Sequence, residues 1–297
     1  MDNRAEVRKF LTTRRARVAP HDVGLPEGGE RRVAGLRRGE VASLAGVSVE
    51  YYARLERGNL ASASDPVLDS IANALHLHDA ERAHLFDLAR AARDSPVPHA
   101  RRRERFSVSP VLQRTLDAVT AGPAFVRNGR MDVLATNHLA RALYAPVLTA
   151  VGDPANLARF QFLDVAHAEA FYRDLDDVAD DTVATLHAAA GRDPHDRDLQ
   201  ELVGELSTRS EDFRRRWAAH DVRQHSSGAK AFHHPVVGDM TLQYEVAELA
   251  ARPGLTLVIY TAEPGSTSEA NLRLLSSWAA GDVPASPARS DGIARSL

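Results

Sequence analysis

Residues 38–57 read RGEVASLAGVSVEYYARLER, and this stretch decides the fold of the N-terminal part of the chain. Two short helices that meet at a sharp angle need a small residue where they touch and a residue of positive φ in the turn. Ala42 and Gly46 stand at these two places, and Ser48 follows as the N-cap of the second helix. The stretch therefore predicts a helix-turn-helix.

The second helix of this motif has an inward and an outward face. Tyr52 and Leu55 face inward, and the opposite face is free to enter the major groove of DNA. There Arg54 can hold a guanine and Glu50 a cytosine, although the two can also form only an i,i+4 ion pair on a solvated face. The predicted DNA-binding residues are those of the outward face and four arginines before it, which would contact phosphates: Arg31, Arg32, Arg37, Arg38, Ser48, Val49, Glu50, Tyr51, Arg54 and Arg57.

The charge of the chain is distributed unevenly between its two parts. The net charge is -3, but residues 1–105 carry 19 Arg and Lys against 15 Asp and Glu, so the acidic excess lies in the remainder. The basic N-terminal part is therefore the expected DNA-binding part. The chain has no cysteine, which excludes disulfides and thiolate metal sites. No apolar run reaches the roughly 20 residues of a membrane span. We expect a cytoplasmic protein without a membrane partner.

The chain divides into four regions by composition and periodicity. Residues 1–93 hold five helical segments and form an all-α, lambda-repressor-like domain. Residues 94–105 contain prolines and a run of arginines and form a linker, residues 106–280 form a second domain, and residues 281–297 form a tail that we expect to be disordered.

The second domain mixes strands and helices. Strands at 124–126 and 130–136 meet at Asn128-Gly129, a strong hairpin signal. Amphipathic helices are predicted over 163–190 and 199–221. The final elements are strands at 230–234, 241–249 and 255–262 and a helix at 268–279. This order predicts an α+β, PAS-like domain, a five-stranded antiparallel sheet with helices over one face.

The sequence resembles a known family in both parts. The stretch VGLPEGGERRVAGLRRGEVASLAGVSVEYYARLERG resembles the XRE family of helix-turn-helix regulators, in its actinobacterial branch with a MmyB-like ligand-binding domain. The second part is similar to the same branch through GPAFVRNGRMDVLATN, LVGELSTRSEDFRRRWAAHDVR, HHPVVGDMTLQYE and LVIYTAEPGS. Thr136, directly before Asn137, stands where members of this family usually have a tryptophan. The resemblance implies that the second domain holds a fatty-acid-like ligand between sheet and helices.

Apolar and polar side chains of the second domain are available for such a ligand, although aromatic residues at regular spacing are more often ordinary core. We expect Phe125, Asn137, Trp217 and Tyr244 to surround one enclosed cavity. The polar end of the ligand is expected at Asn137, Arg141, His220 or His234. The predicted ligand-binding residues are Phe125, Leu134, Asn137, Arg141, Phe162, Phe171, Phe213, Trp217, His220, His234, Tyr244 and Tyr260.

The sequence contains no motif that predicts catalysis or metal binding. There are 13 histidines, yet no H-E-x-x-H, G-x-S-x-G or phosphate-binding glycine loop is present. We therefore expect no catalytic residue, metal or cofactor apart from the bound ligand. The expected partners are double-stranded DNA, a small apolar ligand and a second copy of the chain. One rival remains, in which the second domain serves only dimerisation or protein docking.

Overall fold

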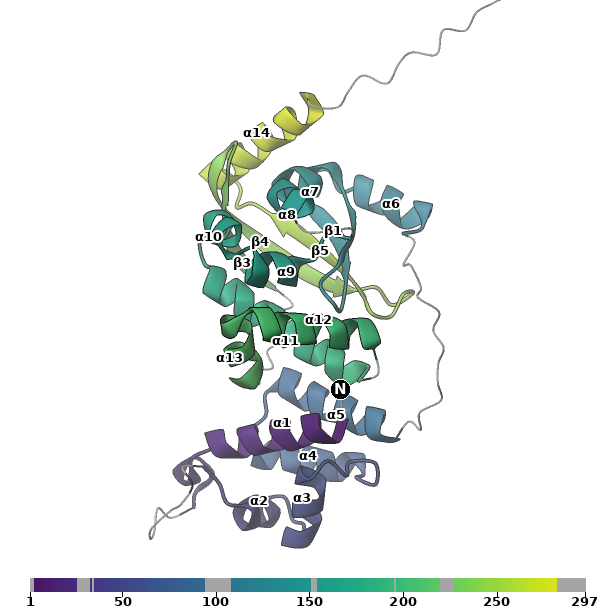
Figure 1. The fold of residues 1–297 in the computed structure, drawn as a ribbon, viewed down its shortest axis with the longest axis vertical. Helices are drawn as coiled ribbons and strands as arrows, with labels where there is room; N and C mark the ends of the chain where they lie inside the picture. Colours follow the sequence, from purple (N-terminus) through teal and green to yellow (C-terminus); the bar gives the residue numbers. More distant parts are fainter. Residues whose placement is uncertain are drawn as a thin grey trace, which may run out of the picture.

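The computed structural model describes residues 3–25, 33, 35–93, 108–150, 154–194, 196–219 and 227–281. Helices α1 to α5 pack around one core in the N-terminal domain (Figure 1). The helices and strands from α6 onward form the second domain, which is stacked on the first. The predicted linker and nearly all of the predicted tail lie outside the described residues. The first domain consists of α1 (Asn3–Arg17), a 3₁₀ turn (Pro20–Val23), α2 (Arg38–Leu44), α3 (Val49–Glu56), α4 (Asp65–Ala74) and α5 (Asp79–Arg93).

The second domain is built on one antiparallel sheet in the order β2-β1-β5-β4-β3. The chain first forms the predicted hairpin, and the last three strands form a meander that adds to it through β5. The predicted five-stranded sheet is therefore confirmed. Its strands are β1 (Ala124–Asn128), β2 (Val133–Thr136), β3 (Ser227–His234), β4 (Gly238–Glu248) and β5 (Leu255–Thr261).

The helices of this domain are shorter and more numerous than the periodicity predicts. The predicted helix over 163–190 breaks at Tyr172, because Tyr172 turns extended and pairs with Phe232 of β3. The predicted helix over 199–221 breaks at Ser210, whose hydroxyl accepts a hydrogen bond from the amide of Phe213. The helices are α6 (Pro110–Asp117), α7 (His138–Leu143), α8 (Ala145–Ala150), α9 (Leu157–Leu163), α10 (Val165–Phe171), α11 (Leu175–Arg192), α12 (Arg197–Arg209), α13 (Glu211–Ala219) and α14 (Thr267–Gly281).

Both faces of the sheet are covered, unequally. The larger core lies between the sheet and α7 to α14, and Phe125, Phe232 and Tyr260 are buried in it. The prediction of helices on one face only is incomplete, because α6 packs Leu116 against Ala124 and Val126 on the other face. Figure 1 shows α11 and α12 as a layer between the sheet and the first domain. This layer is where the two domains meet.

Candidate functional site: a DNA-reading helix and a ligand-binding domain

The turn between α2 and α3 has the geometry that the sequence predicts. Gly46 has φ of 66°, in the left-handed region, and Ala42 is fully buried between the helices. The hydroxyl of Ser48 accepts a hydrogen bond from the amide of Tyr51 at 3.1 Å and caps α3. Tyr52 and Leu55 are fully buried. These contacts fix which face of α3 points outward.

The outward face of α3 presents one apolar and several polar side chains. Val49 is exposed and suits contact with a thymine methyl group. The guanidinium of Arg54 stacks on the ring of Tyr51 at 4.9 Å, which holds it along the helix. The alternative role of Arg54, an i,i+4 ion pair with Glu50, is not observed among the ion pairs of the described residues. Arg54 is therefore available for a base.

Arg38 is less independent than its predicted role as a phosphate contact implies. Its guanidinium pairs with Glu56, a buried carboxylate that also accepts a hydrogen bond from Arg15 at 2.8 Å. The hydrogen bond to Glu56 is the main reason that the pKa of Arg38 is raised. Arg38 thus tethers α2 to α3 while about half of its side chain stays exposed. Arg31 and Arg32 lie outside the described residues, and Arg37 begins α2 by donating its amide to Glu40.

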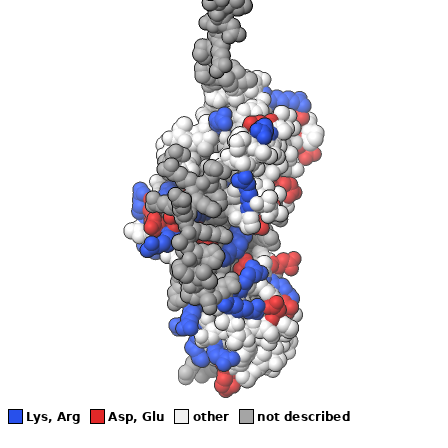
Figure 2. Space-filling model, turned by 90° about the vertical axis from the view of Figure 1, so that its right-hand side faces the viewer, with Lys and Arg blue, Asp and Glu red and all other residues white. Residues whose placement is uncertain are grey.

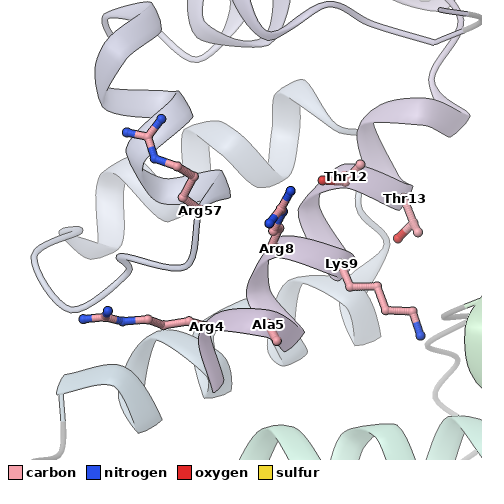
Figure 3. Close-up of a pocket in the computed structure, with 7 residues that line it drawn as sticks. All are labelled: Arg4, Ala5, Arg8, Lys9, Thr12, Thr13 and Arg57. Atoms are coloured by element: carbon pink, nitrogen blue, oxygen red, sulfur yellow. The ribbon is translucent and has the colours of Figure 1, made fainter. Parts of the chain in front are cut away.

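A basic hollow of about 440 Å³ lies between α1 and the end of α3 (Figure 3). Arg4 and Arg8 line it from α1, and Arg57 faces them from the end of α3, as Figure 3 shows. Lys9 also lines it, and its ammonium donates a hydrogen bond to the carbonyl of Trp217 in the second domain. In Figure 2, Lys and Arg side chains are spread over the lower part of the molecule, where the first domain lies. This surface suits a phosphate backbone.

The second domain contains a packed aromatic cluster between the sheet and the helices. Tyr144 is at its centre: its ring lies 5.2 Å from Phe125 and 5.7 Å from Phe171, and its hydroxyl hydrogen-bonds that of Tyr260 at 2.8 Å. Tyr244 joins the cluster at 5.9 Å from Tyr260. Sequence reasoning found four of these five residues and missed Tyr144, which directly follows α7, a helix that it did not predict.

The other predicted lining residues lie elsewhere. Phe162 of α9 stacks edge-on against Phe213 of α13 at 5.0 Å, and Phe213 lies beside Trp217. Trp217 lies flat on the ring of His187 at 3.6 Å, at the boundary with the first domain. Leu134 lies on the opposite face of the sheet, against α6. An irregularity of the β1–β2 register at Leu134 decides its position, since Leu134 and its neighbour Ala135 both pack on this face.

Of the four predicted polar ends, two have structural roles. Asn137 is fully buried; its carbonyl oxygen accepts from the amides of Ala124 and Ala140, and its amide group donates to two backbone carbonyls. His234 is buried and hydrogen-bonds the carbonyl of Ala142. Arg141 is exposed, and His220 lies outside the described residues.

The prediction of one cavity around Phe125, Asn137, Trp217 and Tyr244 is wrong. Asn137 caps α7 beside the start of β1, whereas Trp217 lies at the domain boundary. The hollows described in this structure are the basic one and one of about 250 Å³ beside α12, which Leu199 and Gln200 line. Neither lies between the sheet and the aromatic cluster.

The structure brings two charged residues together on the helix-covered face of the sheet, Lys230 of β3 and Asp181 of α11. Arg127 of β1 lies on the same face of the sheet. The ammonium of Lys230 lies 3.7 Å from the carboxylate of Asp181 and 4.9 Å from the ring centre of Tyr244. Sequence reasoning missed them, although Arg127 shares a strand face with Phe125 and is therefore a charge where alternation expects a core residue.

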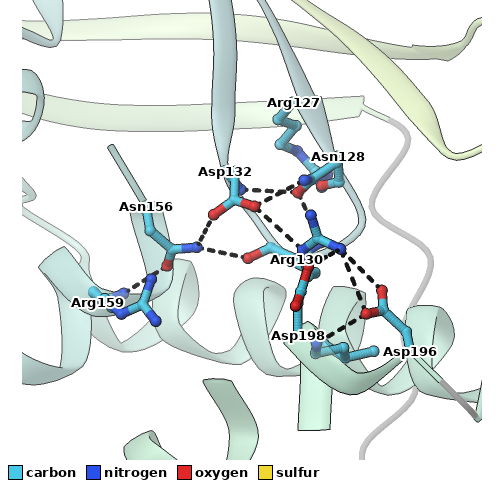
Figure 4. Close-up of polar contacts among 9 residues, drawn as sticks. Arg127, Asn128, Arg130, Asp132, Asn156, Arg159, Asp196 and Asp198 are labelled. Carbon is cyan, nitrogen blue, oxygen red and sulfur yellow. Dashed lines mark hydrogen bonds and ion pairs between the residues drawn. The ribbon is translucent and has the colours of Figure 1, made fainter. Parts of the chain in front are cut away.

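A polar network fixes the end of the strand that carries Arg127 (Figure 4). The carboxylate of Asp132 accepts from Asn128 at 2.8 Å and from Asn156 at 2.7 Å. Arg130 joins Asp132 to Asp196 at the start of α12. Figure 4 shows the Arg127 side chain turned away from these carboxylates. The network uses its carboxylates internally and holds the hairpin against α9 and α12.

The domains meet through buried charged and aromatic groups. His187 of α11 is fully buried, with Nδ1 3.4 Å from a carboxylate oxygen of Glu6 in α1. The carbonyl oxygen of Trp217 accepts from His187 and also from Lys9, at 3.1 Å. Burial at this boundary lowers the pKa of Lys9. At Gly191 the helix approaches His84 of α5 so closely that a Cβ would lie 2.6 Å from its ring.

The described residues contain neither a cluster of metal-binding side chains nor a membrane-spanning helix. In these residues no three His, Asp or Glu side chains are grouped to hold a metal ion. No helix within the described ranges is long and apolar enough to cross a membrane.

Comparison with known families identifies both parts of the chain. Residues 6–85 match a family described as a helix-turn-helix domain. Residues 108–275 match the family described as MmyB-like transcription regulator ligand binding domain. Neither is an enzyme family. Among curated proteins, no significant match is found.

Proposed function

Since the chain belongs to the family of transcription regulators with a MmyB-like ligand-binding domain, we propose that it is a cytoplasmic, operator-binding homodimer controlled by a fatty-acid-like ligand. The outward face of α3 reads bases in the major groove. The ligand occupies the second domain and changes the affinity of the first for DNA. A ligand can do so only through different affinities for the two states, typically 1–3 kcal/mol of coupling.

One observation carries this proposal: α11 contacts both functional parts. Its Asp181 faces Lys230 and Tyr244 of the sheet, and its His187 and Gly191 face the first domain. Any ligand that displaces α11 from the sheet therefore disturbs the domain boundary. Figure 1 shows that α3 lies on the far side of the first domain from this boundary. The second domain thus leaves α3 open to DNA.

The fatty-acid-like character of the ligand is supported by the composition of the space between sheet and helices. Phe125, Phe171 and Tyr260 are buried there, and an acyl chain gains about 0.8 kcal/mol for each CH₂ transferred into such surroundings. The rings touch one another in this state, so the ligand must part them or the helices above them. The homodimer is supported by the small size of one α3, which offers too few base contacts to select an operator alone.

The test combines ligand extraction with DNA binding. The purified protein is analysed by native mass spectrometry before and after extraction with organic solvent, and both samples are titrated with operator DNA. We expect to find the mass of a co-purified lipid-like molecule. Operator affinity should change at least fivefold when this molecule is removed or added back. If no such mass is found and affinity is unchanged by added fatty acids, the second domain is a dimerisation or docking module.

A further inference from the structure

We propose that the basic hollow between α1 and the end of α3 holds phosphate groups of a DNA backbone strand, outside the bases that α3 reads. This inference rests on the proposed function, since it requires DNA binding, and adds to it a second contact surface that α1 provides. The DNA-binding residues expected from the sequence include Arg57 but neither Arg4 nor Arg8.

A tight contact between α1 and the end of α3 fixes the position of this hollow. Gly58 directly follows Arg57 and has φ of 99°, in the left-handed region. It lies so close to α1 that an added Cβ would be 2.6 Å from the Cα of Arg4. Both the backbone angle and the close approach require glycine here. Arg57 is therefore held beside the start of α1, across the hollow from Arg8 (Figure 3).

The hollow continues the outward face of α3. Arg57 follows Arg54 by three positions, a spacing that puts both on one side of the helix, and both are exposed. On α1, Arg4 and Arg8 are four positions apart, about 6 Å along the helix axis, and both are exposed as well. Exposed arginines thus lead from the DNA-reading helix to α1.

The hollow has an excess of positive charge. Of the seven described residues that line it, none is acidic. The ion pairs of the described part of the chain include neither Arg8 nor Arg57. Glu56, directly before Arg57, is buried and pairs with Arg15 and Arg38. Its charge is therefore neutralised, and the hollow attracts anions.

Other polar groups of the hollow already make contacts within the protein. The ammonium of Lys9 donates to the carbonyl of Trp217 at 3.1 Å. The hydroxyl of Thr12 donates to Glu56 at 3.4 Å, and that of Thr13 donates to a carbonyl of its own helix at 2.8 Å. Arginine side chains are therefore the groups that meet an anion here, and their planar forks match the geometry of phosphate.

The open shape of the hollow favours a backbone strand over a small molecule. Pockets for small molecules enclose most of the ligand and are largely apolar. Here Arg4, Arg8 and Arg57 are exposed, and Figure 3 shows Arg4 and Arg57 extending in different directions. A DNA strand presents a row of phosphates, so different arginines can contact different phosphates. Such contacts add affinity without base preference.

Because these contacts carry no sequence information, the experiment does not need the operator. The full-length protein is titrated into a labelled random-sequence duplex of about 30 base pairs, by fluorescence anisotropy between about 0.05 and 0.2 M salt. Wild type is compared with Arg8→Gln, Arg57→Gln and Arg8→Lys. The matched control is Arg90→Gln, which removes an exposed arginine of the same domain that pairs with Asp87.

Each glutamine variant of the hollow should bind about fivefold more weakly at about 0.15 M salt. This factor follows from a slope of about −0.9 in log affinity against log salt for each phosphate contact, taken between 1 M and 0.15 M. The slope itself should become shallower by about one. Arg8→Lys should keep the wild-type slope, because an ammonium also neutralises a phosphate. The control Arg90→Gln should bind as wild type does.

Thermal unfolding separates a binding role from a structural one. Since Arg8 and Arg57 are exposed, their glutamine variants should unfold within about 2 °C of wild type. The two arginines lie on separate helices, so Arg57→Gln repeats the test if Arg8→Gln unfolds at a lower temperature.

Three results would overturn the proposal. Wild-type affinity and slope in both glutamine variants would do so, while leaving base reading by α3 intact. Equal losses in Arg8→Lys and Arg8→Gln would show that charge is not what acts. Isothermal titration with tripolyphosphate tests the other source of phosphate: binding that Arg8→Gln abolishes, with unchanged DNA affinity, would make the hollow a site for small anions. If wild type binds no DNA at all, the proposed function fails as well.

Discussion

The domain boundary can be tested by one added methyl group, Gly191→Ala. Gly191 is a buried residue in the last turn of α11, and a Cβ there would lie 2.6 Å from two ring atoms of His84. His84 is 2% exposed and packs edge-on against Phe10, so its ring cannot swing aside. The substitution therefore forces α11 and α5 apart without adding or removing a charge.

The expected size follows from two opposed effects. Overpacking a well-packed contact costs about 1–3 kcal/mol. Replacing a helical glycine by alanine stabilises by about 0.5–1 kcal/mol, because alanine loses less backbone entropy. The net effect of Gly191→Ala is therefore a loss of up to about 2.5 kcal/mol in the free energy of unfolding. Urea denaturation followed by circular dichroism measures this loss. The ratio of operator affinities with and without ligand should also fall toward one.

Gly204→Ala is the matched control. Gly204 is an exposed glycine of the neighbouring helix α12, and an added Cβ would meet no atom within 4 Å. This variant keeps the gain in helix propensity without the clash, so it should be more stable than wild type. The two variants should differ by about 1–3 kcal/mol. Equal stability of the two would refute the domain contact as described, and an unchanged ligand response in Gly191→Ala would refute α11 as the connection.

Three further predictions concern DNA binding, assembly and pH. Arg54→Ala should cost about 1–3 kcal/mol of binding free energy at the operator and relax base preference, whereas Arg38→Ala should weaken binding to all DNA sequences about equally. Competition binding against random DNA measures both effects. If Arg54→Ala weakened binding to the operator and to random DNA equally, its base contact would be refuted. Footprinting should protect two half-sites about 34 Å, or a multiple, apart, and a single protected half-site from a monomer would contradict the dimer. Burial lowers the pKa of His234, so folded His234 stays neutral where the unfolded residue takes up a proton. Its contribution to stability is therefore complete above about pH 6.5 and declines below it. The stability difference between wild type and His234→Gln should shrink from pH 7.5 to pH 5, and a pH-independent difference would contradict this.

Local features of the chain were predictable because their causes are local. The helix-turn-helix follows from Ala42, Gly46 and Ser48, whose size, backbone freedom and capping oxygen act within a few residues. The hairpin at Asn128-Gly129 and the alternation of β4 are equally local. Helix boundaries were less predictable: the break at Tyr172 depends on pairing with Phe232, which lies sixty residues away.

The sequence by itself thus determined the two-part organisation, the helix-turn-helix with the outward face of its second helix, and the sheet of the second domain. Only the tertiary structure decided which charges meet. Lys230 and Asp181 come from β3 and α11, and their approach depends on which helix covers the sheet. The same holds for Glu6 and His187, which are 181 positions apart in the chain. Periodicity says that a side chain points inward, but the three-dimensional packing of distant elements alone determines which side chains it faces.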